Sequence, residues 1–142
     1  MRKRVLILCS GNSARSQMAE AILRHLSRGS IDVASAGSAP QPEIHPMARQ
    51  AVRTLLGIEM EGQRPKSLQQ FLGRSLDDVI TVCDRAAERC PVFPGVPRQI
   101  HWSFEDPAAV AGSDEQRQKA FDDVAKELLV KLKAWLESVQ QP

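Results

Sequence analysis

The chain has 142 residues, 42% of them hydrophobic and 25% charged, and its formal net charge is +2. This length suits one domain over residues 1–142 with a real hydrophobic core, and the composition excludes a disordered or low-complexity chain. So small a charge, together with the absence of any Tyr, gives no basis for a nucleic-acid partner.

The first apolar run predicts a buried strand over 3–8 and not a signal peptide. It follows Arg2-Lys3-Arg4 and stops after four residues at Cys9, whereas the apolar region of a signal peptide needs about 7 to 15 residues. No other stretch is apolar over a length that could span a bilayer. We therefore expect a soluble, cytoplasmic protein without a membrane partner, and we expect it to be a monomer.

The remaining elements follow from apolar spacing and from signals at helix ends. Met18, Ile22 and Leu26 have the spacing that gives a helix one buried stripe. Ser-x-x-Gln patterns at 67–70 and 113–116 are capping boxes that open two further helices. In chain order, we expect helices over 17–28, 46–56, 68–72 and from 114 onward, and strands over 31–35, 78–82 and 98–102.

Strands that alternate with helices predict an α/β fold, a single three-layer domain with a mostly parallel sheet between helices. In such sheets, ligands bind beyond the carboxyl ends of the strands. Cys9 and Cys83 each come directly after a predicted strand. We therefore expect the two cysteines to lie at the same edge of the sheet.

The segment from Cys9 to Ser16 carries the clearest functional signal, a Cys followed after five residues by Arg-Ser. Small residues between a strand and a helix let successive backbone amides point inward and bind a tetrahedral oxyanion. Gly11 and Asn12 tolerate left-handed backbone angles, and the next helix adds its positive N-terminal end. The residues expected to hold the oxyanion are Ser10, Gly11, Asn12, Ser13, Ala14, Arg15 and Ser16.

Two side chains of this loop favour nucleophilic chemistry at Cys9. Arg15 offers a planar, permanently charged fork to two anion oxygens, and Ser16 can donate a hydrogen bond to the sulfur. These partners stabilise a Cys9 thiolate, which would lie below a bound oxyanion as a nucleophile aimed at phosphorus or arsenic. The alternative is a strand-ending Cys that packs in the core beside an incidental Arg.

The same segment resembles the signature loop of the low-molecular-weight protein tyrosine phosphatases. Residues 9–20 read Cys-Ser-Gly-Asn-Ser-Ala-Arg-Ser-Gln-Met-Ala-Glu, which is most similar to the form found in thioredoxin-coupled arsenate reductases, with Ser10 in place of a Thr. Cys83, Cys90 and the segment 101–108 resemble the rest of that pattern, so the likeness spans almost the whole chain.

The resemblance implies a four-stranded parallel sheet flanked by helices and a set of catalytic roles. Cys9 would be the nucleophile, Arg15 the oxyanion clamp and Asp106 the general acid. Cys83 and Cys90 would form the redox-active disulfide. The implied function is the reduction of arsenate to arsenite, with thioredoxin or a similar external dithiol as reductant and no tightly bound cofactor.

Cys83 and Cys90 distinguish this function from its closest alternative, a low-molecular-weight tyrosine phosphatase. A phosphatase needs one cysteine because water hydrolyses its phospho-enzyme, whereas two-electron reduction of arsenate needs a second thiol that forms a disulfide. A regular helix would hold the two cysteines about 10 Å apart, beyond the Cα separation of about 7 Å that a disulfide permits. The segment 84–89 must therefore bend or unwind.

Several residues allow more than one interpretation. We predict no metal site, because no His has a spacing that matches the cysteines, although packing or a former zinc site would also explain Cys83 and Cys90. His101 is assigned to packing at a strand end, and Asp106 could cap a turn because it precedes Pro. The segment 62–67 departs from the pattern of a family in which some members bind a monovalent cation near this position, so the resemblance does not extend to a cation site there. A non-catalytic oxyanion or redox sensor is a further functional alternative.

Overall fold

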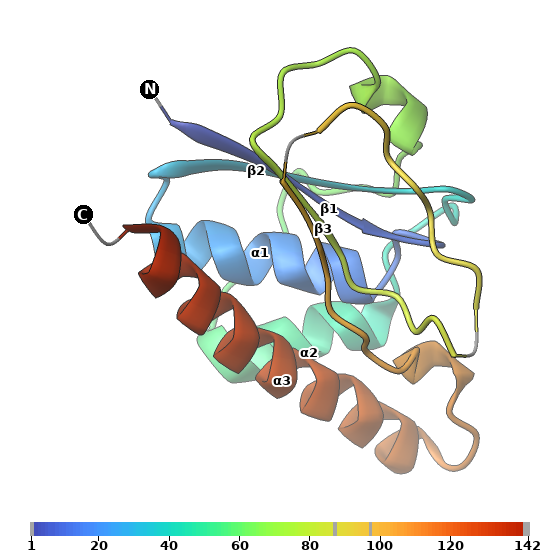
Figure 1. Cartoon of the computed structure of the whole chain (residues 1–142). Helices are drawn as coiled ribbons and strands as arrows, with labels where there is room; N and C mark the ends of the chain where they lie inside the picture. The colour runs from blue at the N-terminus through green and yellow to red at the C-terminus, as the bar shows by residue number, and fades with distance from the viewer. Residues whose placement is uncertain (1, 87, 97, 141–142) are drawn as a thin grey trace.

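The computed structural model describes residues 2–86, 88–96 and 98–140, which form a four-stranded sheet with helices packed against it (Figure 1). The strands are β1 (Lys3–Cys9), β2 (Ile31–Gly37), β3 (Asp78–Thr81) and β4 (Arg98–His101). They lie in the order β2-β1-β3-β4, and each neighbouring pair is parallel. The predicted α/β fold is therefore confirmed. The predicted strand bounds are off by one or two residues, since β2 runs on to Gly37 and β3 and β4 stop earlier than expected.

The helices within the described residues are α1 (Arg15–Ser27), α2 (Pro46–Leu56), the 3-10 helices η1 (Leu68–Phe71) and η2 (Pro107–Ala109), and α3 (Asp114–Gln140). The Ser113 hydroxyl accepts from the Gln116 N–H, and the Gln116 side chain accepts from the Ser113 N–H, which completes the predicted capping box. α1 begins two residues earlier and ends one residue earlier than expected, because Arg28 takes the left-handed conformation (φ 51°) and ends the helix. None of the helices described is both long and apolar enough to cross a membrane.

The two faces of the sheet bury different side chains, because successive residues of a strand point to opposite faces. In β1, Val5, Ile7 and Cys9 belong to the main core, which they share with residues of α1, α2 and α3. Leu6 and Leu8 belong to a smaller core with Phe71 of η1 and Phe93. The three α-helices thus gather on one face (Figure 1), and η1 and coil cover the other.

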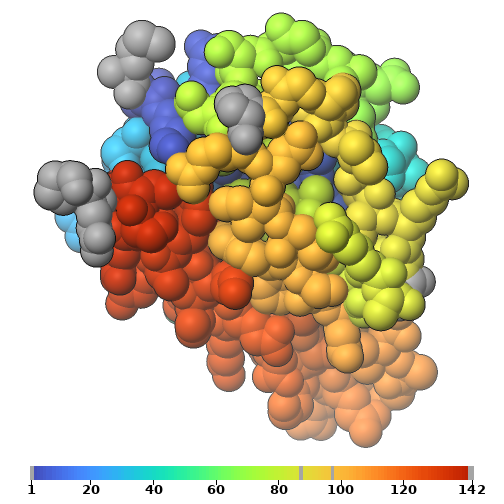
Figure 2. Space-filling view, in the orientation of Figure 1, coloured from blue at the N-terminus to red at the C-terminus, as the bar shows by residue number. Residues whose placement is uncertain are grey.

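The parallel arrangement brings the carboxyl ends of β1 and β3 to one edge of the sheet. These strands are neighbours, with Leu8 opposite Thr81, so Cys9 and Cys83 come at the same edge, as predicted. After β3 the chain crosses the face of the molecule seen in Figure 2, and η2 lies against α3 there. The chain after β3 therefore lies over the loop that follows β1, although the two are far apart in sequence.

Candidate active site

The loop over residues 9–16, called the anion loop below, is held in one shape by buried hydrogen bonds. Asn12 is fully buried and takes the left-handed conformation (φ 49°), whereas Gly11 does not. The Asn12 amide donates to the hydroxyls of Ser16 (2.7 Å) and Ser35 (3.0 Å). Its Oδ1 accepts from the Lys66 N–H (3.0 Å). These hydrogen bonds tie the loop to β2 and to the backbone at Lys66.

Gly37 at the end of β2 lets the anion loop lie directly against the sheet. A Cβ atom at this position would lie 2.5 Å from the Ser10 carbonyl oxygen and 3.0 Å from the Asn12 Cβ. Because the first of these neighbours is backbone, a side chain here would push the loop away. Only glycine fits this position without moving the site.

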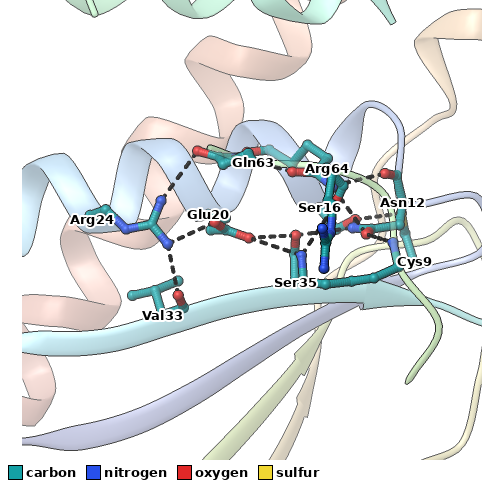
Figure 3. A network of polar contacts seen from close by, with 11 residues as sticks. Cys9, Asn12, Ser16, Glu20, Arg24, Val33, Ser35, Gln63 and Arg64 are labelled. Carbon is teal, nitrogen blue, oxygen red and sulfur yellow. Dashed lines mark hydrogen bonds and ion pairs between the residues drawn. The ribbon is translucent and has the colours of Figure 1, made fainter. Parts of the chain in front are cut away.

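A buried carboxylate anchors the loop to the interior (Figure 3). Glu20 is 3% exposed and accepts from the Ser35 hydroxyl (2.7 Å) and from Arg24 (2.7 Å), while Lys66 Nζ lies 3.9 Å away. Burial lowers the pKa of Lys66, against the attraction of Glu20. Two cations and a hydroxyl thus satisfy Glu20, and Ser35 links it to the loop.

Ser16 directs its hydroxyl at the sulfur of Cys9. Cys9 is 2% exposed, and its Sγ lies 2.8 Å from Ser16 Oγ. Because the Asn12 amide already donates to Ser16 Oγ, the hydroxyl hydrogen of Ser16 is left for the sulfur. Such a donor stabilises a thiolate more than a thiol, as we expected from the sequence.

Arg15, the first residue of α1, is buried, and both terminal nitrogens of its guanidinium donate hydrogen bonds. Its side chain is 4% exposed, and its Nη1 donates to the carbonyl of Phe104 (3.1 Å). Nη1 and Nη2 both donate to Glu88, at 2.5 and 2.8 Å, and Asp106 Oδ2 lies 3.9 Å from Nη2. Burial alone would lower the pKa of Arg15, but its hydrogen bonds to Glu88 and the charges around it raise that pKa above its usual value. Arg15 is therefore a permanent cation at this site.

The anion loop opens onto a cavity of about 500 Å³. Residues 9–15 line it together with the segment 41–46 and with Glu88, Asp106 and Ala108. Asp106 is 41% exposed, and its Oδ1 accepts from the Ala108 N–H (3.0 Å) while Oδ2 is the oxygen nearest Arg15. Asp106 thus caps η2, as the turn interpretation predicted, and also presents a carboxylate to the cavity.

Cys83 and Cys90 are joined by a disulfide, with their Cα atoms 5.9 Å apart. Cys83 is buried and Cys90 is half-buried, and Cys9 is a free cysteine. The described residues between the two cysteines are not helical, in agreement with the separation that a disulfide requires. The structure is therefore that of the disulfide-bonded form.

Glu88 is the site residue that the sequence did not reveal. Its carboxylate occupies the Arg15 fork that we assigned to an oxyanion, and it also accepts from the Ser10 hydroxyl (2.8 Å) and the Asp84 N–H (3.2 Å). Burial would raise the pKa of Glu88, but the hydrogen bonds from Arg15, Ser10 and Asp84 lower it. Glu88 is therefore an anion already bound to the Arg15 and Ser10 side chains of the anion loop.

His101 lies beside the disulfide, which its spacing in the sequence did not indicate. Thr81 and His101 are partners in the register of β3 and β4, and Thr81 Oγ1 lies 2.6 Å from His101 Nδ1. One ring nitrogen of His101 and the sulfurs of Cys83 and Cys90 lie within 4.8 Å of one another. The packing position predicted for His101 thus brings it to the two cysteines, whose sulfurs offer no thiolate to a metal while they are bonded to each other.

Known proteins match the chain along nearly its whole length. The family model for the low molecular weight phosphotyrosine protein phosphatases matches residues 4–142. The arsenate reductase of Halalkalibacterium halodurans is 36% identical over 141 residues, which are 97% of this chain and 99% of that protein.

Solved structures agree with this match. An arsenate reductase in the phosphate-binding state has a TM-score of 0.77 at 25% identity, over 97% of this chain and 99% of the other. The thioredoxin-dependent arsenate reductase of Corynebacterium glutamicum has a TM-score of 0.71 at 29% identity, over 98% of this chain and 62% of that one. Sequence, fold and the anion loop agree, and the chain belongs to the low molecular weight phosphotyrosine protein phosphatase family.

Proposed function

We propose that the chain is an arsenate reductase that works through Cys9, Cys83 and Cys90 and is recycled by thioredoxin or a similar dithiol. The observation that carries the proposal is the Cys83–Cys90 disulfide, whose segment contacts the anion loop while Cys9 stays a free thiol. Similarity to two proteins supports it: the arsenate reductase of H. halodurans and the thioredoxin-dependent arsenate reductase of C. glutamicum.

The first step is the attack of the Cys9 thiolate on arsenate bound in the anion loop. Loop amides and Arg15 hold the oxygens, which requires that Glu88 first leave Arg15. As the sulfur–arsenic bond forms, the arsenic–oxygen bond breaks, and Asp106 protonates the departing oxygen, which leaves as water. Arsenic is still in its oxidised state at this point.

The second step transfers two electrons. The Cys83 thiolate attacks the sulfur of Cys9, and the electron pair of the sulfur–arsenic bond stays with arsenic, which leaves as arsenite. Cys90 then attacks Cys83 and releases Cys9 as a thiolate. The product is the Cys83–Cys90 disulfide, and an external dithiol reduces it while being oxidised to its own disulfide.

Hydrolysis of phosphomonoesters is the second candidate, because Cys9, Arg15 and Asp106 would suffice for it. The cavity argues against a phosphotyrosine substrate. No Phe, Tyr or Trp is among the described residues that line it, so the imidazole of His45 is the aromatic ring that the described lining offers to an aryl group. Ala108 follows Asp106-Pro107 at the cavity wall and adds only a methyl group.

The deciding experiment measures NADPH oxidation by thioredoxin and thioredoxin reductase in the presence of the protein and arsenate. We expect arsenate-dependent oxidation and, in a parallel assay, slow hydrolysis of an aryl phosphate. Hydrolysis without NADPH oxidation would make the chain a phosphatase. Neither activity, with phosphate binding retained, would make it an oxyanion or redox sensor.

Asp106→Asn should lower arsenate turnover by about 100-fold, the usual contribution of a general acid, and leave phosphate affinity unchanged. Asn keeps the Oδ1 acceptor that caps η2, so the turn is retained. The proton donor is lost together with the charge of a carboxylate that is 41% exposed. Initial rates in the coupled assay and phosphate titration of the same sample measure the two quantities. Glu105→Gln is the matched control, since it neutralises the exposed neighbouring carboxylate. An unchanged rate with Asp106→Asn would remove Asp106 from the mechanism.

A further inference from the structure

Glu88 competes with any oxyanion for the same two nitrogens of Arg15. A carboxylate and a tetrahedral oxyanion both present a pair of oxygens that matches a guanidinium fork. Here Nη1 and Nη2 donate to Glu88, and the Ser10 hydroxyl of the anion loop donates to the same carboxylate. An oxyanion that binds Arg15 through this fork must therefore displace Glu88. The two anions exclude each other.

The disulfide constrains the segment that carries Glu88. It closes a short ring from the buried Cys83, two residues beyond the end of β3, to Cys90, with Glu88 two residues before the closing cysteine. Inside the ring the Glu88 N–H donates to the Asp84 carbonyl (2.9 Å), and the Asp84 N–H donates to the Glu88 carboxylate (3.2 Å). Ring closure removes most of the conformations that a largely exposed segment would otherwise sample.

Reduction of the disulfide removes this constraint. None of the described residues of the segment 84–89 is buried. After reduction, Glu88 is therefore kept near Arg15 mainly by its hydrogen bonds with Arg15, Ser10 and Asp84. The free energy of ordering the segment then opposes the contact. An incoming oxyanion with more charge than a carboxylate can displace Glu88 more easily from the reduced protein than from the oxidised one.

We propose that Glu88 is a redox-controlled gate on the oxyanion site, a regulation that rests on the relay proposed above. In the disulfide form Glu88 stays on Arg15 and excludes oxyanions. A dithiol opens the gate by giving two electrons to the Cys83–Cys90 bond, which leaves two thiols and an oxidised reductant. The spent protein has no Cys83 thiol to resolve a Cys9–arsenic adduct, and the gate prevents that adduct from forming.

The test is calorimetric titration of phosphate into the air-oxidised protein and into the protein reduced with dithiothreitol. We expect the reduced form to bind at least about tenfold more tightly, a factor within the range of one charge-assisted hydrogen bond. In Glu88→Gln the oxidised form should bind as tightly as the reduced form. Glu43→Gln is the matched control, since it removes a negative charge from the same cavity and should keep the redox difference.

Equal phosphate affinities in the two forms of the unmodified protein would overturn the gate. A Glu88→Gln variant that kept the full redox difference would overturn it as well. If that variant did not fold, Glu88→Asp, which shortens the side chain by one methylene, should show a smaller difference in phosphate affinity between the oxidised and reduced forms. Phosphate binding needs no turnover, so the titration tests the gate independently of the reductase activity. If phosphate affinity depended on the redox state but arsenate were not reduced, the relay alone would be wrong. If arsenate were reduced but phosphate affinity were the same in both redox states, the gate alone would be wrong.

Discussion

Cys9→Ser is expected to abolish arsenate reduction and aryl phosphate hydrolysis together, by about 10⁴-fold or more, as loss of a covalent nucleophile does in other enzymes. Both reactions begin with attack by the same sulfur. A serine hydroxyl is a far weaker nucleophile at neutral pH, and the described surroundings of residue 9 offer a hydroxyl donor, Ser16, in place of a base. Rates in the thioredoxin-coupled assay and with an aryl phosphate, measured on one preparation, give the two losses.

The fold and the anion loop should survive this substitution. Serine is close to cysteine in size, and residue 9 is 2% exposed within a packed strand end. Phosphate affinity of the reduced variant should therefore match that of the reduced parent protein, which serves as the control for folding. Substantial arsenate reduction by Cys9→Ser would mean that Cys83 or Cys90 attacks arsenic directly.

Cys83→Ser and Cys90→Ser are expected to stop the cycle at different steps. Without Cys83 nothing resolves the Cys9–arsenic adduct, so thioredoxin-coupled reduction should be lost while aryl phosphate hydrolysis remains, because water resolves a phospho-enzyme. Without Cys90 each chain should release one arsenite and then stall as a Cys9–Cys83 disulfide. Each variant is the matched control of the other, since both remove one thiol and the same native disulfide.

The measurement is a single-turnover experiment with reduced protein, followed by thiol mapping. Arsenite is quantified per chain, and mass spectrometry locates the disulfide. We expect about one arsenite and a Cys9–Cys83 bond for Cys90→Ser, and neither for Cys83→Ser. Repeated turnover by Cys90→Ser with thioredoxin would show that Cys90 only packs against the core. Turnover by Cys83→Ser would transfer the resolving role to Cys90.

Features that depend on neighbours along the chain could be predicted from the sequence. The apolar run of β1, the small residues of the anion loop and the stripe of α1 are each local, and the structure has all of them in place. The end of β2 was predicted too early because Gly37, which reads as a loop residue, continues the pairing opposite Cys9. A residue of weak strand propensity stays in the strand where the loop must approach closely.

Contacts made across the fold could not be predicted. Glu88 lies 73 residues from Arg15, in a polar segment without periodicity, so nothing local marks its carboxylate as an anion for the loop. His101 reaches the cysteines only because the register of β4 places it opposite Thr81. From the sequence, either Gly11 or Asn12 could have taken the left-handed backbone conformation. The buried hydrogen bonds of Asn12 explain why Asn12 adopts it.

Hydrogen bonds from Asn12 through Ser35 to Glu20 couple anion binding at the loop to the folding of the whole domain. The anion loop is tied to side chains that are buried in the interior, so we expect it to unfold together with the sheet and α1. An anion that binds only the folded loop stabilises the whole domain, by about 2.7 kcal/mol at a concentration 100 times its Kd. Inorganic phosphate inside a cell would thus raise the melting temperature of this protein while it occupies the place of the substrate.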